Sequence, residues 1–131
     1  MIRAAIATVA LAAALTAGGS TAQTTAAERQ EAKFAKALEG LTRGEPTSCI
    51  SRDRVSYIKT FPDKIVYVLG RNKKWVNETN GGCNGLKHDD IVVTKSFNGQ
   101  LCRGDIVETR SRSGGMMTGA CSLGEFVPYT R

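Results

Sequence analysis

The only histidine of the chain stands beside two aspartates, and this is its densest group of side chains that could do chemistry. His88 is followed by Asp89 and Asp90. Imidazole and carboxylate groups are ligands for zinc and other divalent cations. At the start of a strand, where successive side chains point to opposite faces, His88 and Asp90 would share one face and Asp89 the other. Two ligands hold a cation only loosely, so we predict a structural role at a turn and strand entry.

Nucleophilic catalysis finds little support in the sequence. A serine nucleophile needs a base that a third group orients, and any histidine base would have to be His88. Neither a Gly-x-Ser-x-Gly elbow nor a phosphate-binding glycine loop is present. We therefore predict no catalytic, metal-ligating or cofactor-binding residues, and no cofactor. A metal-dependent hydrolase that uses His88 and nearby carboxylates is kept as an alternative.

Four cysteines are spread widely along the chain, at intervals of 34, 19 and 19 positions. They are Cys49, Cys83, Cys102 and Cys121. An even number of cysteines in an oxidising compartment indicates two disulfides, for which three pairings exist. The absence of a Cys-x-x-Cys pair argues against a zinc site and a thioredoxin-like redox site. A hairpin turning near residues 111–112 would set Cys102 opposite Cys121 and leave Cys49 for Cys83.

The first 22 residues have the three parts of a secretory signal peptide. Arg3 supplies a positive charge, residues 4–17 form an apolar run, and the small residues Ser20 and Ala22 fit a signal-peptidase site. The run of about 14 residues is shorter than the ~20 that cross a bilayer as a helix. We predict cleavage after Ala22, export to the periplasm or beyond, and no membrane span in the mature chain.

The mature chain is basic, because removal of residues 1–22 lowers the formal net charge only from +6 to +5. Positive charge attracts anionic partners over a distance. The charges are spread along the sequence, and only Lys73-Lys74 and Arg110-Ser111-Arg112 are locally dense. We predict a solvated basic surface and no nucleic-acid site, since strand alternation would put Lys74 and Trp75 on opposite faces. The partner stays unknown, and an anionic or protein partner in the cell envelope fits the charge.

Residues 25–41 are predicted to form a helix. Most of their side chains favour helix, and apolar positions recur at i, i+4 and i+7. Thr25 and Glu28 have the spacing of a capping box, and Gly40 or Gly44 would end the helix. The apolar stripe is thin, so we expect few contacts with the rest of the domain.

The pattern beyond residue 46 is that of strands. The first three predicted strands cover residues 55–61, 65–69 and 74–78, with a turn at residues 70–73. The second and third would form a hairpin that sets Trp75 opposite Val68. Trp75 is therefore interpreted as a packing residue rather than a ligand platform.

Asn98-Gly99 is the clearest local signal, because it separates two runs of strand-forming residues. Asn-Gly in this setting predicts a two-residue type I′ hairpin, in which facing residue numbers add to 197. One face would carry Ile91, Val93, Lys95, Phe97, Gln100, Cys102, Gly104 and Ile106. This face is the more apolar, so Cys102 is predicted to point into the core.

The remaining residues complete a mostly β fold. A turn at residues 111–115 leads into a strand at 117–121, and residues 123–129 form a last strand that Pro128 restricts to an edge. We predict an α+β fold with one N-terminal helix and an antiparallel meander of about six short strands, closed as a small barrel or curled sheet. The divisions are a signal peptide (1–22), a helical segment (23–45) and a disulfide-stapled β domain (46–131).

Several segments resemble a family of small exported proteobacterial proteins that is classed as a domain of unknown function. They are Pro46-Thr47-Ser48-Cys49-Ile50, Arg52, Arg54-Val55, Gln100-Leu101-Cys102-Arg103-Gly104-Asp105 and Leu123-Gly124-Glu125-Phe126-Val127-Pro128-Tyr129. The resemblance covers about residues 28–131 and implies no catalytic residues, because the family has no established activity. It implies a common Cys49–Cys102 bridge, which leaves Cys83–Cys121 as an additional one.

The sequence thus favours a small, exported, non-enzymatic module that binds a partner or stabilises a component of the envelope. An inhibitor or accessory of an envelope or secreted enzyme is the second hypothesis, because a rigid disulfide-braced domain loses little entropy on binding. Its contact would be the basic hairpin tip Arg71-Asn72-Lys73-Lys74. The hydrolase that uses His88 is the third.

Overall fold

The computed structural model describes residues 25–131, and the predicted signal peptide lies outside the described residues. This part of the chain forms one α-helix, eleven strands and two short 3₁₀ turns. They are α1 (Ala26–Ala37), β1 (Thr42–Arg43), β2 (Cys49–Ser51), η1 (Arg52–Arg54), β3 (Tyr57–Phe61), β4 (Lys64–Gly70), β5 (Lys73–Glu78), β6 (Asn80–Gly82), η2 (Asn84–His88), β7 (Ile91–Lys95), β8 (Gln100–Cys102), β9 (Ile106–Arg110), β10 (Met117–Ser122) and β11 (Phe126–Thr130).

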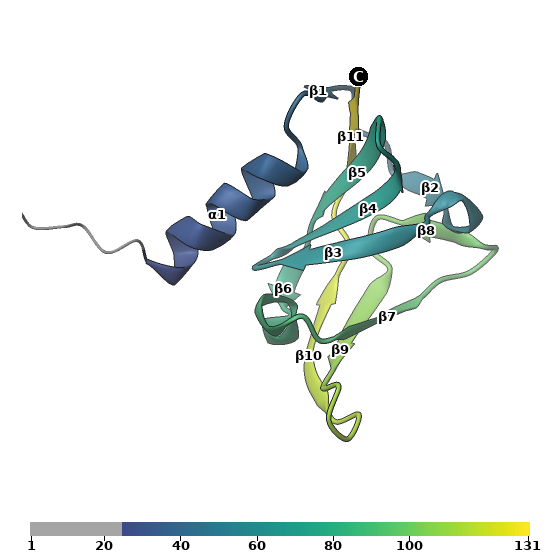
Figure 1. The fold of residues 1–131 in the computed structure, drawn as a ribbon. Coiled ribbons are helices and arrows are strands. Elements are labelled where there is room, and N and C mark those ends of the chain that lie inside the picture. The colour runs from purple at the N-terminus through teal and green to yellow at the C-terminus, as the bar shows by residue number, and fades with distance from the viewer. Residues whose placement is uncertain (1–24) are drawn as a thin grey trace, which may run out of the picture.

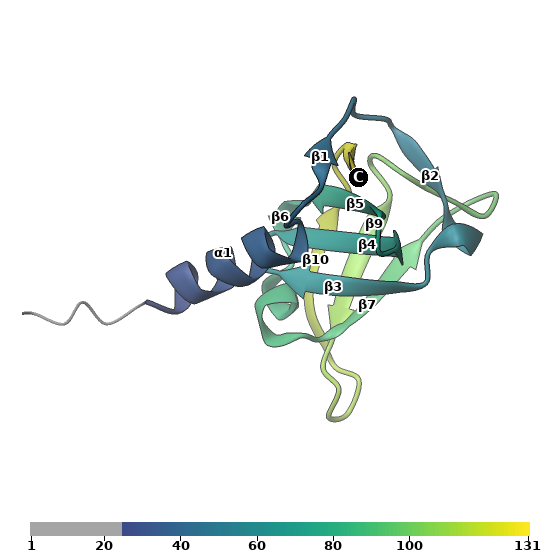
Figure 2. The ribbon, with the colours of Figure 1, turned by 45° about the horizontal axis from the view of Figure 1, so that its top comes forward.

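The strands form three antiparallel sheets (Figure 1). Sheet 1 has the order β1-β11-β5-β4-β3, and sheet 2 has the order β6-β10-β9-β7. The two-stranded ribbon of β2 and β8 is separate from both. In Figure 2 the strands of sheet 1 cross over those of sheet 2, so the two sheets form the layers of the domain.

The main hydrophobic core lies between the two sheets. Tyr67 of β4, Val107 of β9 and Phe126 of β11 are each at most 3% exposed. The rings of Tyr67 and Phe126 have centroids 5.6 Å apart. Ile50 and Leu101 bring the apolar side of the ribbon onto the same core. Each sheet therefore turns one face towards this shared core, as two-layer β domains do.

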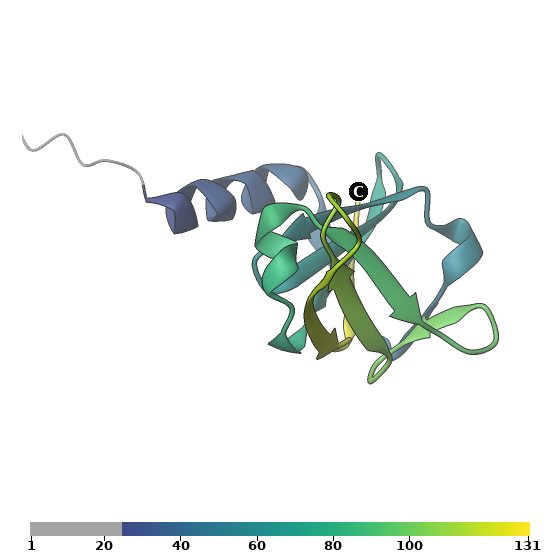
Figure 3. The ribbon, with the colours of Figure 1, turned by 90° about the horizontal axis from the view of Figure 1, so that it is seen from below.

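Helix α1 packs on the opposite face of sheet 1, so β4 is buried on both sides. Phe34 of α1 meets Phe61 of β3 edge-on, with ring centroids 5.4 Å apart. The Nζ atom of Lys64 lies 4.4 Å from the centre of the Phe34 ring. Every residue of α1 keeps some exposure, and Figure 3 shows its N-terminal half extending away from the sheets. The prediction that this helix makes few contacts with the rest of the domain is confirmed.

The start of α1 is also confirmed, whereas its end is earlier than predicted. The Thr25 hydroxyl accepts a hydrogen bond from the Glu28 N–H, and the Glu28 carboxylate accepts one from the Thr25 N–H, each at 3.2 Å. The helix ends at Ala37 rather than at residue 41. Gly40 has a φ of +76°, a left-handed conformation that turns the chain towards β1. Because β1 pairs with β11, the residues after Ala37 belong to a turn and a strand.

The predicted mostly β, antiparallel fold with one helix is confirmed, whereas the predicted number of strands was wrong, and of the two predicted closures, a small barrel or a curled sheet, the barrel does not form. Eleven strands replace about six, and the described strands do not close into a barrel. The additional strands β1, β2 and β6 have two or three residues each, too few for a pattern of side chains to reveal them. The predicted strand that follows Asn98-Gly99 is divided into β8 and β9. The edge strands are β1 and β3 in sheet 1 and β6 and β7 in sheet 2.

The β4–β5 hairpin forms, but its predicted register was wrong. Trp75 faces Tyr67 rather than Val68. The pairing shifts between Val68 and Gly70, which makes Leu69 the extra residue of a β-bulge. That one residue moves all later pairs of the hairpin by one position. Trp75 does pack against the main core, as its interpretation as a packing residue requires.

The turn at Asn98-Gly99 forms without the predicted hairpin around it. Both residues have positive φ, 62° and 68°, as a type I′ turn requires. Facing residue numbers in β7 and β9 add to 201 rather than 197. Strand β8 leaves sheet 2 and pairs with β2, where Cys102 lies opposite Cys49. The disulfide to Cys49 and the burial of Leu101 stabilise this pairing more than the local hairpin pairing would.

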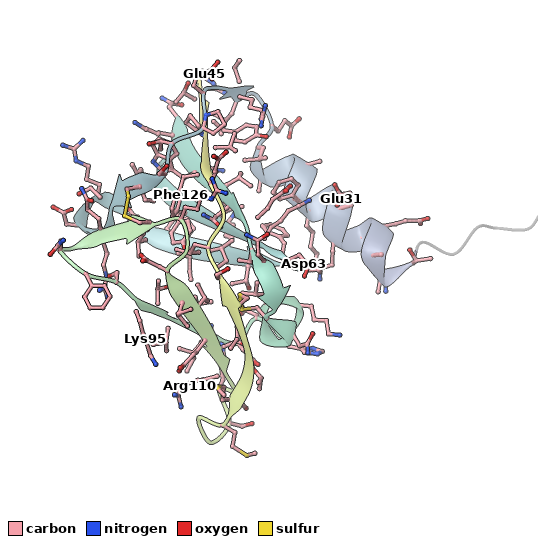
Figure 4. The ribbon with its side chains drawn as sticks, turned by 180° about the vertical axis from the view of Figure 1, so that it is seen from behind. Glu31, Glu45, Asp63, Lys95, Arg110 and Phe126 are labelled. Carbon is pink, nitrogen blue, oxygen red and sulfur yellow. A yellow bond between two sulfur atoms is a disulfide. The ribbon has the colours of Figure 1, made fainter. Side chains whose placement is uncertain are left out.

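The face of β7 and β9 that was predicted to enter the core faces solvent instead. Ile91, Val93 and Ile106 are 42%, 36% and 48% exposed. Leu101 is buried and Cys102 is only half-buried, so the predicted burial of Cys102 was wrong. The same outer face carries Glu108 between two cations, Lys95 and Arg110, each 2.9 Å away. Figure 4 labels Lys95 and Arg110, which lie near each other on this side of the molecule.

Pro128 lies in β11, which is flanked by β1 and β5 and is not the predicted edge strand. The Pro128 carbonyl accepts a hydrogen bond from the Gly44 N–H at 2.8 Å, on the side of β1. The proline nitrogen faces that same side, so the missing N–H removes no bond to β5. The shortness of β1 is what makes this position tolerant of proline.

A buried amide ties β5 to the segment before β11. Asn77 is fully buried, and its Nδ2 donates to the Gly124 carbonyl at 2.8 Å. The Gly124 N–H donates in return to Oδ1 of Asn77, also at 2.8 Å. A side chain at Gly124 would collide with the Glu78 carbonyl, so glycine is required here. Asn77 thus supplies a substitute for strand pairing where the backbone has none.

Candidate functional site

Two disulfides cross-link segments that lie far apart in the sequence. Cys49 is bonded to Cys102, and Cys83 to Cys121, the pairing that the family resemblance implies. The first joins β2 to β8, and the second joins the start of η2 to β10. Cys83 and Cys121 are 4% and 6% exposed, whereas Cys49 and Cys102 are half-buried.

The structure separates the three residues that the sequence brings together at 88–90. His88 is exposed at the end of η2 and does not begin a strand. Asp89 accepts a hydrogen bond from the Thr60 hydroxyl at 3.3 Å, and Asp90 accepts one from Thr118 at 2.7 Å. Within residues 25–131, no three His, Cys, Asp or Glu side chains are grouped to hold a metal ion.

The chain has a Ser-x-x-Lys spacing at residues 56–59, which some serine acyl transferases use. On a helix this spacing puts both side chains on one face. Here the chain is extended, so Ser56 and Lys59 point to opposite faces. The Ser56 hydroxyl donates to the Leu69 carbonyl at 3.4 Å. The spacing therefore assembles no nucleophile and base.

The predicted basic tip between β4 and β5 is divided by strand alternation. The Nζ atom of Lys73 lies 5.2 Å from the centre of the Trp75 ring. Lys74 points to the other face of sheet 1, where it donates a hydrogen bond to the Ala37 carbonyl at the end of α1. Lys74 therefore belongs to a different surface from the rest of the tip.

That surface is a groove of about 590 Å³ beside the free edge of β3. Figure 3 shows the end of α1, β3 and the η2 turn on this side of the molecule. Five of the eight lysines of the chain line the groove: Lys33, Lys36, Lys59, Lys74 and Lys87. We call this surface the lysine groove. Its ammonium groups come from α1, β3, β5 and η2, so only the folded chain assembles it.

The positive charge of the lysine groove is not neutralised by neighbouring carboxylates. None of the five lysines forms a salt bridge with another residue in 25–131. Asp89 is the one acidic residue among those that line the groove. Its carboxylate already contacts Arg112, at 3.7 Å, and the Thr60 hydroxyl. Like charges gathered in a concave surface raise its potential and attract anions.

Lys74 is the most constrained of the five ammonium groups. Burial lowers its pKa below the usual value, and repulsion from Lys59 acts in the same direction. The Ala37 carbonyl stands at the C-terminal end of α1, where the helix dipole favours a cation. A bound anion would stabilise the charged form of Lys74 and offset the repulsion from Lys59.

A second groove, of about 500 Å³, lies over β5 and β11 and has a mixed lining. Two arginines and two glutamates line it: Arg43, Arg103, Glu78 and Glu125. Arg103 and Glu125 form a salt bridge of 3.2 Å. Because cations and carboxylates alternate there, this groove lacks the one-sided charge of the lysine groove.

The sequence contained only a weak sign of the lysine groove. Lys33 and Lys36 are spaced i, i+3 on the predicted helix, which puts them on one face. Lys59 and Lys74 are too far away in the chain to be connected with them without the sheet order. The prediction of a dispersed basic surface therefore missed this gathering of charge.

Comparison of the chain with protein-family models, curated proteins and solved structures finds no match. The resemblance to the family of small exported proteins therefore stays a prediction. No helix within residues 25–131 is both long and apolar enough to cross a membrane.

Proposed function

We propose that this protein is an exported, non-enzymatic binding module that takes an acidic partner in the lysine groove. The observation that carries the proposal is the gathering of five lysines without a salt bridge among the described residues. The partner is a macromolecule that presents several negative charges along a short segment. An acidic protein segment in the envelope meets this description.

The chemistry of lysine decides what kind of recognition this is. An ammonium is a compact point charge on a flexible stem, whereas an arginine fork imposes planar two-point geometry. A site built from lysines therefore selects ligands by the density of their negative charge rather than by the shape of one anionic group. Attraction of this kind speeds association and weakens as salt is added.

We also propose that the protein is exported. The predicted signal peptide and the four cysteines support this proposal. All four cysteines of the described chain are in disulfides, and such bonds persist in oxidising compartments. Membership of the family of small exported proteins is proposed on the same footing. The exposed position of His88 and the separate partners of Asp89 and Asp90 support a binding role over hydrolysis.

The test measures binding of poly-L-glutamate at low ionic strength. The variant Lys33→Glu/Lys59→Glu/Lys87→Glu reverses three exposed charges of the groove. We expect it to lose at least about tenfold in affinity, since removing close charge pairs from an interface commonly costs more than 1.4 kcal/mol. Added salt should weaken binding to the unchanged protein.

A matched control is Arg54→Glu/Arg71→Glu/Lys73→Glu, which changes the net charge equally at exposed residues outside the groove. Equal losses in both variants would mean that only the net charge matters and would contradict the proposal. A larger loss in the control would instead favour the basic tip as the contact of an inhibitor. Stoichiometric metal in the purified protein, with hydrolysis that His88→Ala removes, would favour the hydrolase.

A further inference from the structure

One edge strand of each sheet flanks a second, apolar cleft. Strand β3 ends sheet 1 and β7 ends sheet 2, and Figure 2 shows them as neighbours in different layers. The hydrogen bond between Thr60 and Asp89 links the two edges at one end. Towards the other end, beside η1 and β8, they enclose a cleft of about 210 Å³. We call it the edge cleft.

The walls of the edge cleft are aliphatic. Val55, Ile58, Val92 and Leu101 line it from four different segments of the chain. Ile58 and Val92 come from the inward faces of β3 and β7, where a barrel would have continued the core. Apolar walls that meet a few polar groups are the usual composition of a small-molecule site.

The polar groups of the cleft include one hydroxyl that lacks a partner. Tyr67 lines the cleft and is 97% buried, being 3% exposed. Its hydroxyl makes no hydrogen bond with any residue of the described chain. Thr94, which also lines the cleft, makes no close hydrogen bond with Tyr67, but its hydroxyl acts to lower the Tyr67 pKa, as a donor to the phenolic oxygen does. The proton of the Tyr67 hydroxyl therefore still has no acceptor in residues 25–131. Burial raises the pKa of Tyr67, so this hydroxyl stays protonated and is a donor at neutral pH.

A buried donor without a partner is costly, and native proteins contain few of them. We propose that the edge cleft binds a small, mostly apolar molecule with one neutral hydrogen-bond acceptor, such as a carbonyl oxygen, to which Tyr67 donates. The edge cleft and the lysine groove share Ile58 in their linings, but the polar groups differ, a Tyr67 hydroxyl in the cleft and lysine ammonium groups in the groove. This second site goes beyond the proposed binding of an acidic partner.

The surroundings of Tyr67 decide the charge of the acceptor. The negative charge of Asp105 acts on the Tyr67 hydroxyl. A carboxylate beside Tyr67 would meet this repulsion and would also lose its hydration. A carbonyl meets neither cost and accepts the same hydrogen bond. Arg52, the one charged residue among those that line the cleft, is exposed.

The test compares acetophenone with ethylbenzene, which has a similar size but no acceptor. We expect acetophenone to shift the methyl NMR signals of Val55, Ile58, Val92 and Leu101. Tyr67→Phe should weaken acetophenone about fivefold, the value of one hydrogen bond, and leave ethylbenzene unchanged. This variant should fold, because it removes a hydroxyl that has no partner in residues 25–131.

A second pair of variants locates the site independently of the hydroxyl. Ile58→Trp fills the mouth of the cleft and should abolish binding, whereas Ile106→Trp, on the outer face of sheet 2, should not. The proposal is overturned if acetophenone leaves the four methyl signals unmoved up to its solubility. It is equally overturned if the wild type binds both probes with equal affinity, or if Tyr67→Phe binds acetophenone as the wild type does.

Discussion

At the scale of single residues, the fold depends on the buried amide of Asn77. Its two hydrogen bonds to Gly124 are buried, so Asn77→Ala would leave an N–H and a carbonyl without partners. We expect a loss of about 3 kcal/mol in the free energy of unfolding, measured by urea denaturation. Asn72→Ala, at an exposed turn, should change it by less than about 0.5 kcal/mol. Equal effects of the two substitutions would contradict this account.

Glu108 gives the fold a pH dependence of known sign. Hydrogen bonds from Lys95 and Arg110 lower the pKa of Glu108 below its usual value. A carboxyl whose folded pKa is lowered stabilises the protein above its unfolded pKa, about 4.3, and this contribution is lost as the pH falls through the folded pKa. We therefore expect Glu108→Gln to be less stable than the wild type at pH 7.

The difference between the two proteins should shrink as the pH is lowered below about 4. Urea midpoints measured between pH 2 and 7 check this expectation, with Glu45→Gln, at an exposed residue, as the control. A difference between wild type and Glu108→Gln that does not change with pH would show that Lys95 and Arg110 act on packing rather than on charge.

At the scale of elements, the two disulfides should differ in their accessibility to reductants. Cys49–Cys102 joins half-buried residues of the β2–β8 ribbon, whereas Cys83 and Cys121 are buried under η2. Reduction needs a thiolate to reach a sulfur atom. We expect mild reductant followed by alkylation and mass spectrometry to label Cys49 and Cys102 first. Labelling of Cys83 and Cys121 first, or an unreduced peptide joining Cys102 to Cys121, would contradict the structure.

The elements also show how far local sequence determines this fold. The capping box at Thr25 and the turn at Asn98-Gly99 were predicted correctly, because each depends on residues within three positions of one another. The strand registers on either side of the turns were predicted wrongly. The bulge at Leu69 and the pairing of β8 with β2 depend on contacts between distant segments, which local patterns do not contain.

The candidate site was predicted less well than the fold. The cysteine bridges followed from a resemblance rather than from spacing, and the histidine and its aspartates proved to be separate. Lys33 and Lys87 lie more than fifty positions apart in the sequence, and only the placement of α1 and η2 around β3 brings their charges into one groove. Such a site can be identified only from the tertiary structure.

At the scale of the whole molecule, charge is distributed unevenly over a small disulfide-linked domain. The outer face of sheet 2 and the groove over β11 pair their cations with carboxylates. The lysine groove does not pair its cations in this way. Repulsion among lysines without salt bridges disfavours the folded state, and the proposed binding of an acidic partner would offset this repulsion.

Acetylation of lysines in the presence and absence of poly-L-glutamate, read by mass spectrometry, tests the central claim most directly. All eight lysines of the chain lie in the described residues, and the three outside the groove are internal controls. The account predicts that the polyanion protects Lys33, Lys36, Lys59, Lys74 and Lys87 at low salt, while Lys64, Lys73 and Lys95 react as before. Uniform protection of all eight, or protection centred on Lys73, would contradict it.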